Sequence, residues 1–574
     1  MKKVRFNPFY REESFMKKAA VLLLALLLVC SLAVPGLAYN EIMTPGGELP
    51  IVTGDYHLVL GTPAVATVTD YENNHLTNYL RERSGIDIEI YLFDNQEYKQ
   101  QLQLMTSAGE KLPDTIWSFG LSAIERESYG RQGYFIPLND FFADGDLAHF
   151  FWDGMKYVPE AKQDLTLKTG LSSDGNLYGF PFWLETVADA WSFGILINNT
   201  FLDALEMDIP VTTDDLYEYL VAVKTKDPNG NGLADEIPLV GHTSWTGDVI
   251  NILMNSFTYY PNQDSSSQLC SDDEGNLYLP YTLEEYREGL RYIHKLYSEG
   301  LISDLSFSQD RYGLQAMTDL EGDQPDVVGA AVSHRSFMFA KHALAERRTH
   351  YTTLGVIEGP EGVAYSPTHL VEPNYSHYIT CDAADPEICF RLLDLCCDAE
   401  TTLTIRYGRE GEYWRWATDE DKAFGAYYSA LGYSDVLFTS ANMALAWGQQ
   451  TDEIWNVNSF TWQPIGFTAL TPATVYENPI SQYNADDWRD GIVARYGKCP
   501  KILVGSLAYT EEEINALGTV QADLKTYVDE CATRFVIGEM DLDADWDTFQ
   551  ATLESMGMSN YLATAQAAYD RAFK

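Results

Sequence analysis

Apolar and polar residues alternate along the first part of the chain in a way that predicts short strands followed by amphipathic helices. Residues 57–60 form a β-rich run, and residues 74–84 carry apolar side chains at helical spacing. The run 86–93 alternates as a strand does, 97–108 again has helical spacing, and 113–117 predicts a further strand. A repeated strand–helix order is typical of a parallel α/β sheet.

The middle of the chain contains two helices with clear start signals. Thr212 and Asp215 resemble a capping box, and Thr282 begins another helix that ends at a glycine. The β-rich run 194–198 is expected to be a strand at which the chain crosses between units, and from Asp385 onward the chain is mostly helical. These patterns predict two α/β lobes, with the chain crossing between them more than once.

The predicted organisation has five parts. They are a signal peptide at 1–38, the first part of an N-lobe at 39–193, the first part of a C-lobe at 194–320, a return to the N-lobe at 321–384, and a mostly helical C-lobe and C-terminal portion at 385–574.

One polar loop, residues 227–236, has the spacing of a cation site. Oxygen-bearing side chains fall at alternate positions, as a loop wrapped around Ca²⁺ requires. Gly232 permits a sharp turn, but the twelfth position of the full EF-hand pattern is Pro238 rather than Glu. A polar turn without a metal is the alternative. The candidate ligands are the side chains of Asp227, Asn229, Asn231, Asp235 and Glu236 and the carbonyl of Leu233.

The N-terminus has the features of a secretory signal peptide. Lys17 and Lys18 precede the apolar run 19–34, and small residues favour cleavage after Ala38. The apolar run is near the lower length limit for a spanning helix and is followed by proline, which argues against the alternative of a membrane anchor. Lipidation at Cys30 is a further alternative, but the residues before it do not fit a lipobox. The mature protein is therefore expected outside the cytoplasm or at the cell surface.

Composition excludes several classes of protein. The 574-residue chain has a formal net charge of −46 and no Lys/Arg cluster after the signal region, so no nucleic-acid surface is expected. Aromatic residues make up 13% of the chain, which suits sugar-like ligands as well as a core. No CxxC pair is present, so zinc is not expected, and the adjacent Cys396 and Cys397 are interpreted as buried thiols.

Several motifs, in their order along the chain, resemble the extracellular solute-binding proteins of carbohydrate ABC importers. The similarity is to the large Gram-positive LplA-like type, related to alginate-binding proteins, and it extends almost from end to end. The motifs include 105–114 (MTSAGEKLPD), 132–139 (QGYFIPLN), 174–181 (DGNLYGFP), 226–239 (KDPNGNGLADEIPL), 297–302 (YSEGLI), 407–413 (YGREGEY) and 534–538 (RFVIG).

The resemblance implies a two-lobed, class II periplasmic-binding-protein-like α/β fold with a ligand cleft between the lobes. It implies a monomer that captures an oligosaccharide or sugar derivative by lobe closure and delivers it to membrane permease subunits, without catalysis. Alginate-binding members hold Ca²⁺ in a loop of the same form as 227–236. A structural calcium ion is therefore implied here as well.

Three tryptophans are candidates for stacking on sugar rings. Trp117 follows a predicted strand end, where α/β sheets present their ligand sites. Trp183, with Glu185, follows the turn at 178–181, and Trp245 lies in a polar loop with little local core to join. Core packing is the alternative for each of them.

Two further ligand residues follow from the resemblance alone. In the alginate-binding relatives a Glu and an aromatic residue three positions later contact the ligand, and the similar positions here are Glu410 and Tyr413. Which of the neighbouring Trp414 and Trp416 reaches the cleft stays open.

Two other functions compete with the solute receptor. An exported glycoside hydrolase could find paired carboxylates among 84 acidic residues, but their spacing singles out no pair. The chain also lacks the sequence motifs of serine hydrolases, zinc proteases and nucleotide-binding proteins. A sensor ectodomain is the other alternative, although no output domain is evident in the sequence.

Overall fold

The structure is a computed structural model that describes most of the chain beyond the predicted signal peptide. The described residues are 41–184, 194–244, 246–261, 267–322, 324–334, 338–339, 346–368, 370–424, 437–440, 451–455, 460, 462–464, 469–470, 479–507 and 509–573. The predicted signal peptide at 1–38 and Cys30 therefore lie outside the described residues.

The first lobe is built on a five-stranded sheet with the order β2-β1-β3-β11-β4. β1 runs parallel to β2 and β3, whereas β11 is antiparallel to both of its neighbours. The predicted strands at 57–60, 86–93 and 113–117 are all part of this sheet. Its strands are β1 (His57–Ala64), β2 (Asp87–Asp94), β3 (Thr115–Ile116), β4 (Phe180–Phe182) and β11 (Asn374–Ile379).

Helices from two separate parts of the chain cover this sheet. The first, α2, begins at Asn74, whose side chain accepts a hydrogen bond from Leu76 N, and ends at Gly85 in the left-handed conformation. The helices of the first lobe are α2 (His75–Ser84), α3 (Tyr98–Ala108), α4 (Ala123–Arg131), α5 (Asn139–Ala143), α6 (His149–Gly154), η1 (Met155–Tyr157), α7 (Glu160–Gln163), α8 (Leu165–Lys168), α16 (Pro386–Leu395) and α17 (Ala399–Tyr407).

The second lobe is built on a four-stranded sheet with the order β10-β5-β9-β6. The run predicted as a crossing strand at 194–198 becomes β5, which lies antiparallel between β10 and β9. β9 is parallel to β6, so the carboxyl ends of these two strands lie at the same edge of the sheet. The strands are β5 (Ile195–Asn198), β6 (Ile237–Val240), β9 (Val328–Val332) and β10 (Tyr351–Thr353).

The capping box expected at Thr212 is present at the start of α11. Thr212 Oγ1 accepts a hydrogen bond from Asp215 N, and the Asp215 carboxylate accepts one from Thr212 N. The helices around this sheet are α10 (Asn199–Leu205), α11 (Thr213–Thr225), α12 (Val249–Met254), η2 (Pro280–Thr282), α13 (Glu284–Ser298), η3 (Asp304–Phe307), α14 (Arg311–Thr318) and η4 (Glu346–His350).

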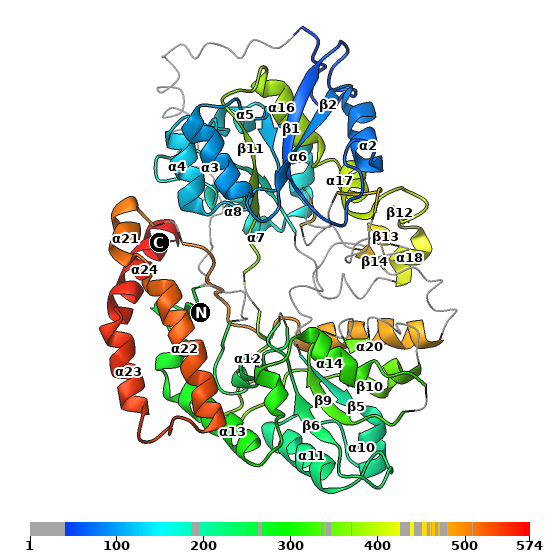
Figure 1. Ribbon diagram of the computed structural model, residues 1–574, viewed down its shortest axis with the longest axis vertical. Coiled ribbons are helices and arrows are strands. Elements are labelled where there is room, and N and C mark those ends of the chain that lie inside the picture. The colour runs from blue at the N-terminus through cyan, green and yellow to red at the C-terminus, as the bar shows by residue number, and fades with distance from the viewer. Residues whose placement is uncertain are drawn as a thin grey trace, which may run out of the picture.

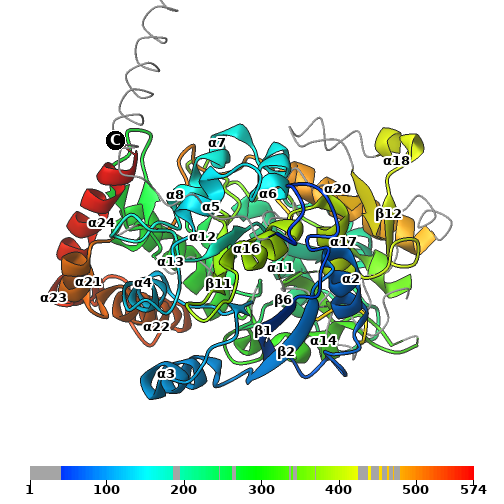
Figure 2. The same ribbon diagram turned by 90° about the horizontal axis from the view of Figure 1, so that it is seen from above.

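The C-terminal helices extend the second lobe. α22 packs against α13, and its apolar side chains join the same core as those of α11 and β5. This region contains α20 (Pro479–Arg495), α21 (Glu511–Leu517), α22 (Val520–Ile537), α23 (Trp546–Ser555) and α24 (Met558–Phe573). Figure 2 shows α21 to α24 together on one side of the molecule.

Two small sheets complete the structure. β12, β13 and β14 form one of them and lie with α18 on the side of the molecule opposite the C-terminal helices (Figures 1 and 2). The elements are β12 (Trp414–Trp416), β13 (Phe438–Ser440), β14 (Ala469–Leu470) and α18 (Asp419–Phe424), and the hairpin of β7 (Cys270–Ser271) and β8 (Leu277–Tyr278).

Figure 1 shows the two lobes one above the other, and the described elements place three crossings of the chain between them. It leaves the first lobe after β4 and enters the second at β5, returns between β10 and β11, and crosses again between β14 and α20. Each lobe has its own core. The predicted two-lobed α/β architecture with several crossings is confirmed.

The division of the chain between the lobes differs from the predicted one. The range 321–384 contains β9 and β10, which pair with β6 and β5 of the second-lobe sheet, so the return to the first lobe begins only near β11. Likewise α16 and α17, in the range 385–574, belong to the first lobe, where α16 contacts β11 and α6. A short apolar strand does not reveal which sheet it joins, because tertiary contacts decide its partners.

Candidate ligand-binding face and calcium loop

The carboxyl ends of β1, β2 and β3 lie at one edge of the first-lobe sheet, the position where α/β sheets present ligand sites. The segments that follow β1 and β2, residues 64–72 and 94–96, line a pocket with a volume of about 600 Å³. Ligand pockets usually measure about 300–1,000 Å³, so this space suits a sugar unit.

The structure places Trp117 directly after β3, but its ring lies in the first-lobe core. The side chain is 2% exposed, and its Nε1 donates to Thr115 Oγ1 at 3.0 Å. Trp183 is fully buried and donates from Nε1 to Thr166 Oγ1 at 3.2 Å. Both rings are covered by protein, which favours the packing alternative over ligand contact. Glu185 lies outside the described residues.

The loop that carries Glu410 and Tyr413 is a compact turn. Tyr413 N donates to Arg409 O at 3.0 Å, and Gly411 N donates to Trp414 O at 2.6 Å. The turn leaves Glu410 exposed and Tyr413 half-buried. Both predicted residues therefore stand on one ordered loop at the start of β12.

The structure separates the roles of the two tryptophans that follow this loop. Trp414 is 1% exposed and donates from Nε1 to Gly408 O at 2.9 Å, whereas Trp416 is 38% exposed. Extended strands point successive side chains to opposite faces, which explains the difference. Of the two, Trp416 is the one with a ring available to a ligand.

A buried carboxylate next to this loop was not found from the sequence. Glu453 is 6% exposed, and its Oε1 lies 2.7 Å from Arg409 Nη1. Its backbone oxygen accepts from Leu76 N, so Glu453 also joins the loop to the start of α2. Its Oε2 is buried without a hydrogen-bond partner. Burial raises the pKa of Glu453, with the nearby Asp452 and Glu412 charges acting in the same direction and Arg409 against it.

The opposing face of the second lobe is formed by loops after β6 and β9. His242 follows β6, and its Nε2 lies 3.0 Å from Oγ of Ser333, which follows β9. Burial lowers the pKa of His242 to about 4, so the ring is neutral at neutral pH. The loop is held in place, since His242 N donates to Gly247 O and Thr243 N donates to Gln309 O, both at 2.9 Å. Trp245, in the same loop, lies outside the described residues.

An exposed tyrosine beside this loop was also missed. Tyr312, at the start of α14, is 61% exposed, and the Arg311 guanidinium lies 4.9 Å from its ring centre and donates to its hydroxyl at 2.9 Å. Arg311 N in turn donates to Ser244 Oγ at 3.2 Å, which connects α14 to the loop after β6. An aromatic residue two positions after a helix N-cap, here Asp310, was the available signal.

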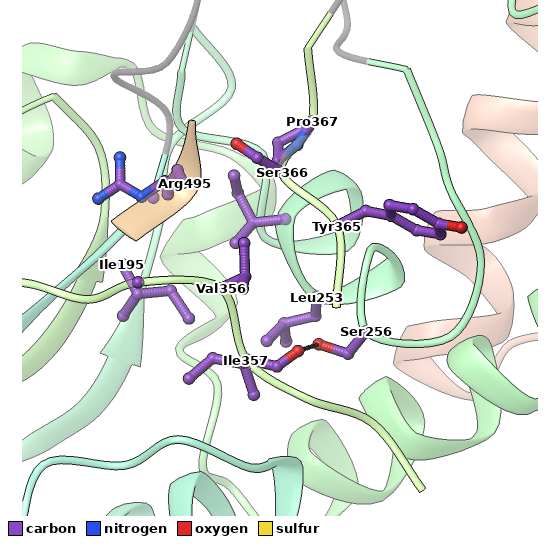
Figure 3. A pocket seen from close by; sticks show the side chains of 12 residues that line it. Ile195, Leu253, Ser256, Val356, Ile357, Tyr365, Ser366, Pro367 and Arg495 are labelled. Carbon is purple, nitrogen blue, oxygen red and sulfur yellow. Dashed lines mark hydrogen bonds between the residues drawn. The ribbon is translucent and has the colours of Figure 1, made fainter. Parts of the chain in front are cut away.

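A narrow pocket lies where the chain leaves the second lobe toward β11 (Figure 3). Ser256 Oγ donates to Ile357 O at 2.8 Å across its base, and Arg495 donates from Nη2 to Leu354 O at 2.7 Å. Its volume of about 20 Å³ holds about one water molecule, which is too small for a sugar.

The predicted calcium loop lies between α11 and β6. The Asp227 carboxylate accepts from Asn231 N at 3.1 Å and from Gly232 N at 2.8 Å, and Gly232 has the positive φ expected for its turn. The Nδ2 groups of Asn229 and Asn231 donate to the Asp235 carboxylate at 3.1–3.3 Å. The side-chain positions 227, 229, 231 and 235 are thus gathered on one side of the loop, as the alternate spacing predicts.

Glu236 provides the test of whether these residues suit a cation. Its Oε1 is buried without a hydrogen-bond partner, and its pKa is raised first by desolvation and then by the charges of Asp227 and Asp235. A divalent cation would offset this unpaired negative charge. Among the described residues, no group of three or more His, Cys, Asp or Glu side chains is already arranged to hold a metal ion. If the side-chain amides of Asn229 and Asn231 were each rotated by half a turn, they would present Oδ1 instead of Nδ2 to a cation in the loop.

The chain has the two-lobed α/β fold of extracellular solute-binding proteins. No protein-family model matches the chain. The chain is 23% identical over 522 residues to the fructooligosaccharide ABC transporter substrate-binding protein FusA of Streptococcus pneumoniae, and the match covers 86% of each chain. The predicted resemblance to solute-binding proteins of carbohydrate ABC importers is confirmed.

Solved structures support the same fold. An extracellular solute-binding protein from Bifidobacterium longum subsp. infantis superposes with a TM-score of 0.69 at 20% identity, over 91% of this chain and 99% of that chain. An EF-hand mutant of FusA in complex with fructo-nystose has a TM-score of 0.64 at 20% identity, over 90% and 99%. The alginate-binding protein AlgQ2 without calcium ion has a TM-score of 0.61 at 19% identity, over 90% and 99%.

No helix among the described residues is long and apolar enough to cross a membrane. Within the same residues the seven cysteines are free thiols, and Cys396 and Cys397 are buried, as the sequence indicates.

Proposed function

We propose that the protein is the extracytoplasmic substrate-binding component of an ABC importer, which captures an oligosaccharide between its lobes and delivers it to membrane permease subunits. The observation that carries this proposal is the pair of α/β lobes joined by three crossings, with loops at strand ends on each lobe. The similarity to FusA over most of both chains points to the same function. FusA and the structural neighbours named above are binding proteins rather than enzymes, which agrees with the absence of a catalytic role.

The ligand contacts that we propose lie on both lobes. On the first lobe they are Glu410 and Tyr413, with Trp416 as an added stacking surface. On the second lobe they are Trp245, predicted from the sequence, and Tyr312, which is exposed beside the same loop. Aromatic rings cover the C–H faces of sugars and carboxylates accept their hydroxyl groups.

A structural calcium ion in the loop 227–236 is part of the proposal. The buried, unpartnered oxygen of Glu236 supports it, and so do the neighbouring charges of Asp227 and Asp235. The structural similarity to an EF-hand mutant of FusA and to AlgQ2 without calcium ion points the same way. The ligands would be Asp227, Asn229, Asn231, Asp235 and Glu236 by side chain and Leu233 by carbonyl, and the ion would fix a long loop between α11 and β6.

The proposed location is extracellular or at the cell surface, and the protein is proposed to be a monomer. The N-terminal sequence supports export with cleavage after Ala38, and a lipid tether at Cys30 is the alternative.

The function is tested by thermal melting of the mature protein with a panel of oligosaccharides, together with an assay for reducing ends. A binding protein is expected to melt at a higher temperature with its ligand and to leave the sugar intact. Release of reducing ends with turnover would contradict the proposal and favour the glycoside hydrolase.

Replacing Trp245 or Glu410 by Ala is expected to weaken binding without unfolding the protein.

A further inference from the structure

One face of α20 attaches this helix to β10, the edge strand after which the chain returns to the first lobe. Residues at intervals of four positions share this face of the helix: Tyr483, Asp487, Gly491 and Arg495. Tyr483 Oη donates to Tyr351 O at 3.0 Å, and the Asp487 carboxylate accepts from Thr353 N at 2.9 Å and from Thr353 Oγ1 at 2.7 Å. Three side chains of the helix and the strand therefore hold α20 directly on β10.

Arg495, the last residue of α20, reaches past the end of β10. Its Nε and Nη2 both donate to Leu354 O, at 3.0 Å and 2.7 Å. The side chain is 2% exposed, and burial lowers the pKa of Arg495 to about 10, with Asp487 acting in the opposite direction. The guanidinium is therefore charged at neutral pH, and its bonds to the carbonyl are of the stronger, charge-assisted kind.

The same guanidinium lies against the start of β5, where the chain enters the second lobe. A Cβ at Gly194 would lie 2.6 Å from Arg495 Cζ and 2.7 Å from Nη2, and Gly194 has no positive φ that would itself disfavour a side chain. Leu354 N donates to Ile195 O at 2.8 Å, and Figure 3 shows Arg495 near Ile195 and Val356. Arg495 thus contacts the second-lobe ends of two crossings, one before β5 and one after β10.

The chain around the end of α20 also follows the second of these crossings. A Cβ at Gly355 would lie 3.2 Å from Ala494 Cβ, and Ser366 N donates to Lys498 O at 2.7 Å. The third crossing leads directly into α20. The end of this helix is therefore the place where the segments that join the lobes are held together on the second lobe.

We propose that Arg495 is a positioning residue of the hinge, which fixes the second-lobe ends of two crossings and so limits the range of lobe separations in the ligand-free protein. Hinge rotation is absorbed by a few residues in loops or at the ends of elements, and Gly194 and Leu354 stand at such ends. Because one buried guanidinium holds both, rotation is confined to the segments beyond them, toward the first lobe.

A narrower range of open forms also reduces the conformational entropy that is lost when the lobes close on a ligand. The inference goes beyond the proposed function and rests on it only for lobe closure.

The test is small-angle scattering and amide hydrogen exchange of the ligand-free mature protein and of Arg495→Gln, which removes Cζ and both Nη groups. The variant should have a larger maximum dimension, because its lobes sample a wider range of separations. Exchange of the Leu354 amide hydrogen should become about tenfold faster, since charge-assisted bonds beside it are lost. A lower melting temperature with an unchanged maximum dimension would show that Arg495 only stabilises the fold, and would overturn the inference.

The reciprocal variant is Gly194→Ala, which keeps every donor of Arg495 but displaces the guanidinium, and it carries the test if Arg495→Gln does not fold. It should also enlarge the maximum dimension. The double variant Gly194→Ala/Arg495→Gln should resemble the more affected single variant, because both changes break one contact. Changes that add in the double variant would overturn the inference. No sugar is needed in these measurements, so a failure to bind any sugar would count against the proposed function alone.

The matched control is Arg391→Gln in α16 of the first lobe. Arg391 is also buried and donates to backbone carbonyls, Thr44 O at 2.9 Å and Pro45 O at 3.2 Å. This variant should lower the melting temperature and leave the maximum dimension unchanged. An equal increase in the maximum dimension of the control would contradict a specific role of Arg495.

Discussion

At the scale of single residues, a buried ionisable group in the first-lobe core should make the free energy of unfolding depend on pH. The Asp394 side chain is fully buried and accepts hydrogen bonds from Phe150 N at 3.0 Å and Phe151 N at 2.7 Å. Desolvation nevertheless raises the pKa of Asp394 to about 7, against the lowering effect of these bonds and of Arg391.

We expect Asp394 to make the protein less stable as the pH rises from 5 to 8. The folded pKa lies above the unfolded value of about 3.9, so the folded state holds the proton more tightly and loses this advantage as pH rises through about 7. Over this range, the free energy of unfolding of the natural protein should fall by on the order of 2–3 kcal/mol more than that of Asp394→Asn. Urea denaturation of both proteins at several pH values measures the difference, and parallel pH profiles would contradict the assignment.

The kinds of residue that bind a sugar could be predicted from the sequence. Which of these side chains are exposed to a ligand and which are buried could not. Trp117 stands at a strand end, where both a ligand residue and a core residue are common, and its burial depends on Trp455 and Phe460 from a distant part of the chain. Glu453 was missed for the same reason: its partner Arg409 is remote in sequence, and nothing in the local pattern around it marks a pair.

At the scale of elements, most local signals were informative but packing was not predictable. The capped start predicted at Thr282 is wrong, because α13 begins after Leu283, which makes no side-chain cap. The capping box at Thr212 and the alternate oxygens of the loop 227–236 depend on neighbours a few residues away, and the structure has the capping contacts and loop turn that the spacing indicates. Strand pairing depends on remote contacts, which is why β9 and β10 were assigned to the wrong lobe.

We expect calcium to stabilise the protein through the loop 227–236. Excess Ca²⁺ over EDTA should raise the melting temperature by a few degrees, because a ligand that binds the folded state alone adds to its stability. The double variant Asp227→Asn/Asp235→Asn should lose this response. Differential scanning calorimetry of the metal-depleted protein measures both effects.

The control for this experiment is another acidic turn in the second lobe. Asp272 accepts a hydrogen bond from Asn276 N at 2.7 Å, as Asp227 does from Asn231 N, but the neighbouring Asp273 is already paired with Lys501. Asp272→Asn should therefore keep the full calcium response. A response that survives in the double variant, or disappears in Asp272→Asn, would rule out the loop as the site.

At the scale of the whole molecule, one contact near the crossings joins a segment beside β11 to the second lobe. Glu372, next to β11, accepts a hydrogen bond from Ser506 N at 2.7 Å, and Ser506 belongs to the segment between α20 and α21 of the second lobe. Gly505 makes this approach possible, because a Cβ there would lie 2.4 Å from Glu372 Oε1.

We expect Gly505→Ala to alter lobe closure. The added methyl group must displace Glu372, so the lobes should adopt a different mean separation and the ligand affinity should fall several-fold. Small-angle scattering with and without ligand reports the separation, and the natural protein should become more compact on binding. Gly145→Ala, where a Cβ meets nothing within 4 Å, is the matched control and should behave as the natural protein does. Equal scattering curves and affinities for the two variants would show that the contact has no part in closure.

The order of strands in the first-lobe sheet also determines when that lobe can be completed during synthesis. β11 lies inside the sheet, between β3 and β4, yet it is encoded after every strand of the second-lobe sheet. A growing chain that ends between Thr353 and Asn374 therefore contains every strand of the second-lobe sheet, but its first-lobe sheet has two unpaired inner edges, which are prone to aggregation. The first-lobe sheet, which begins first, is thus completed after the second-lobe sheet.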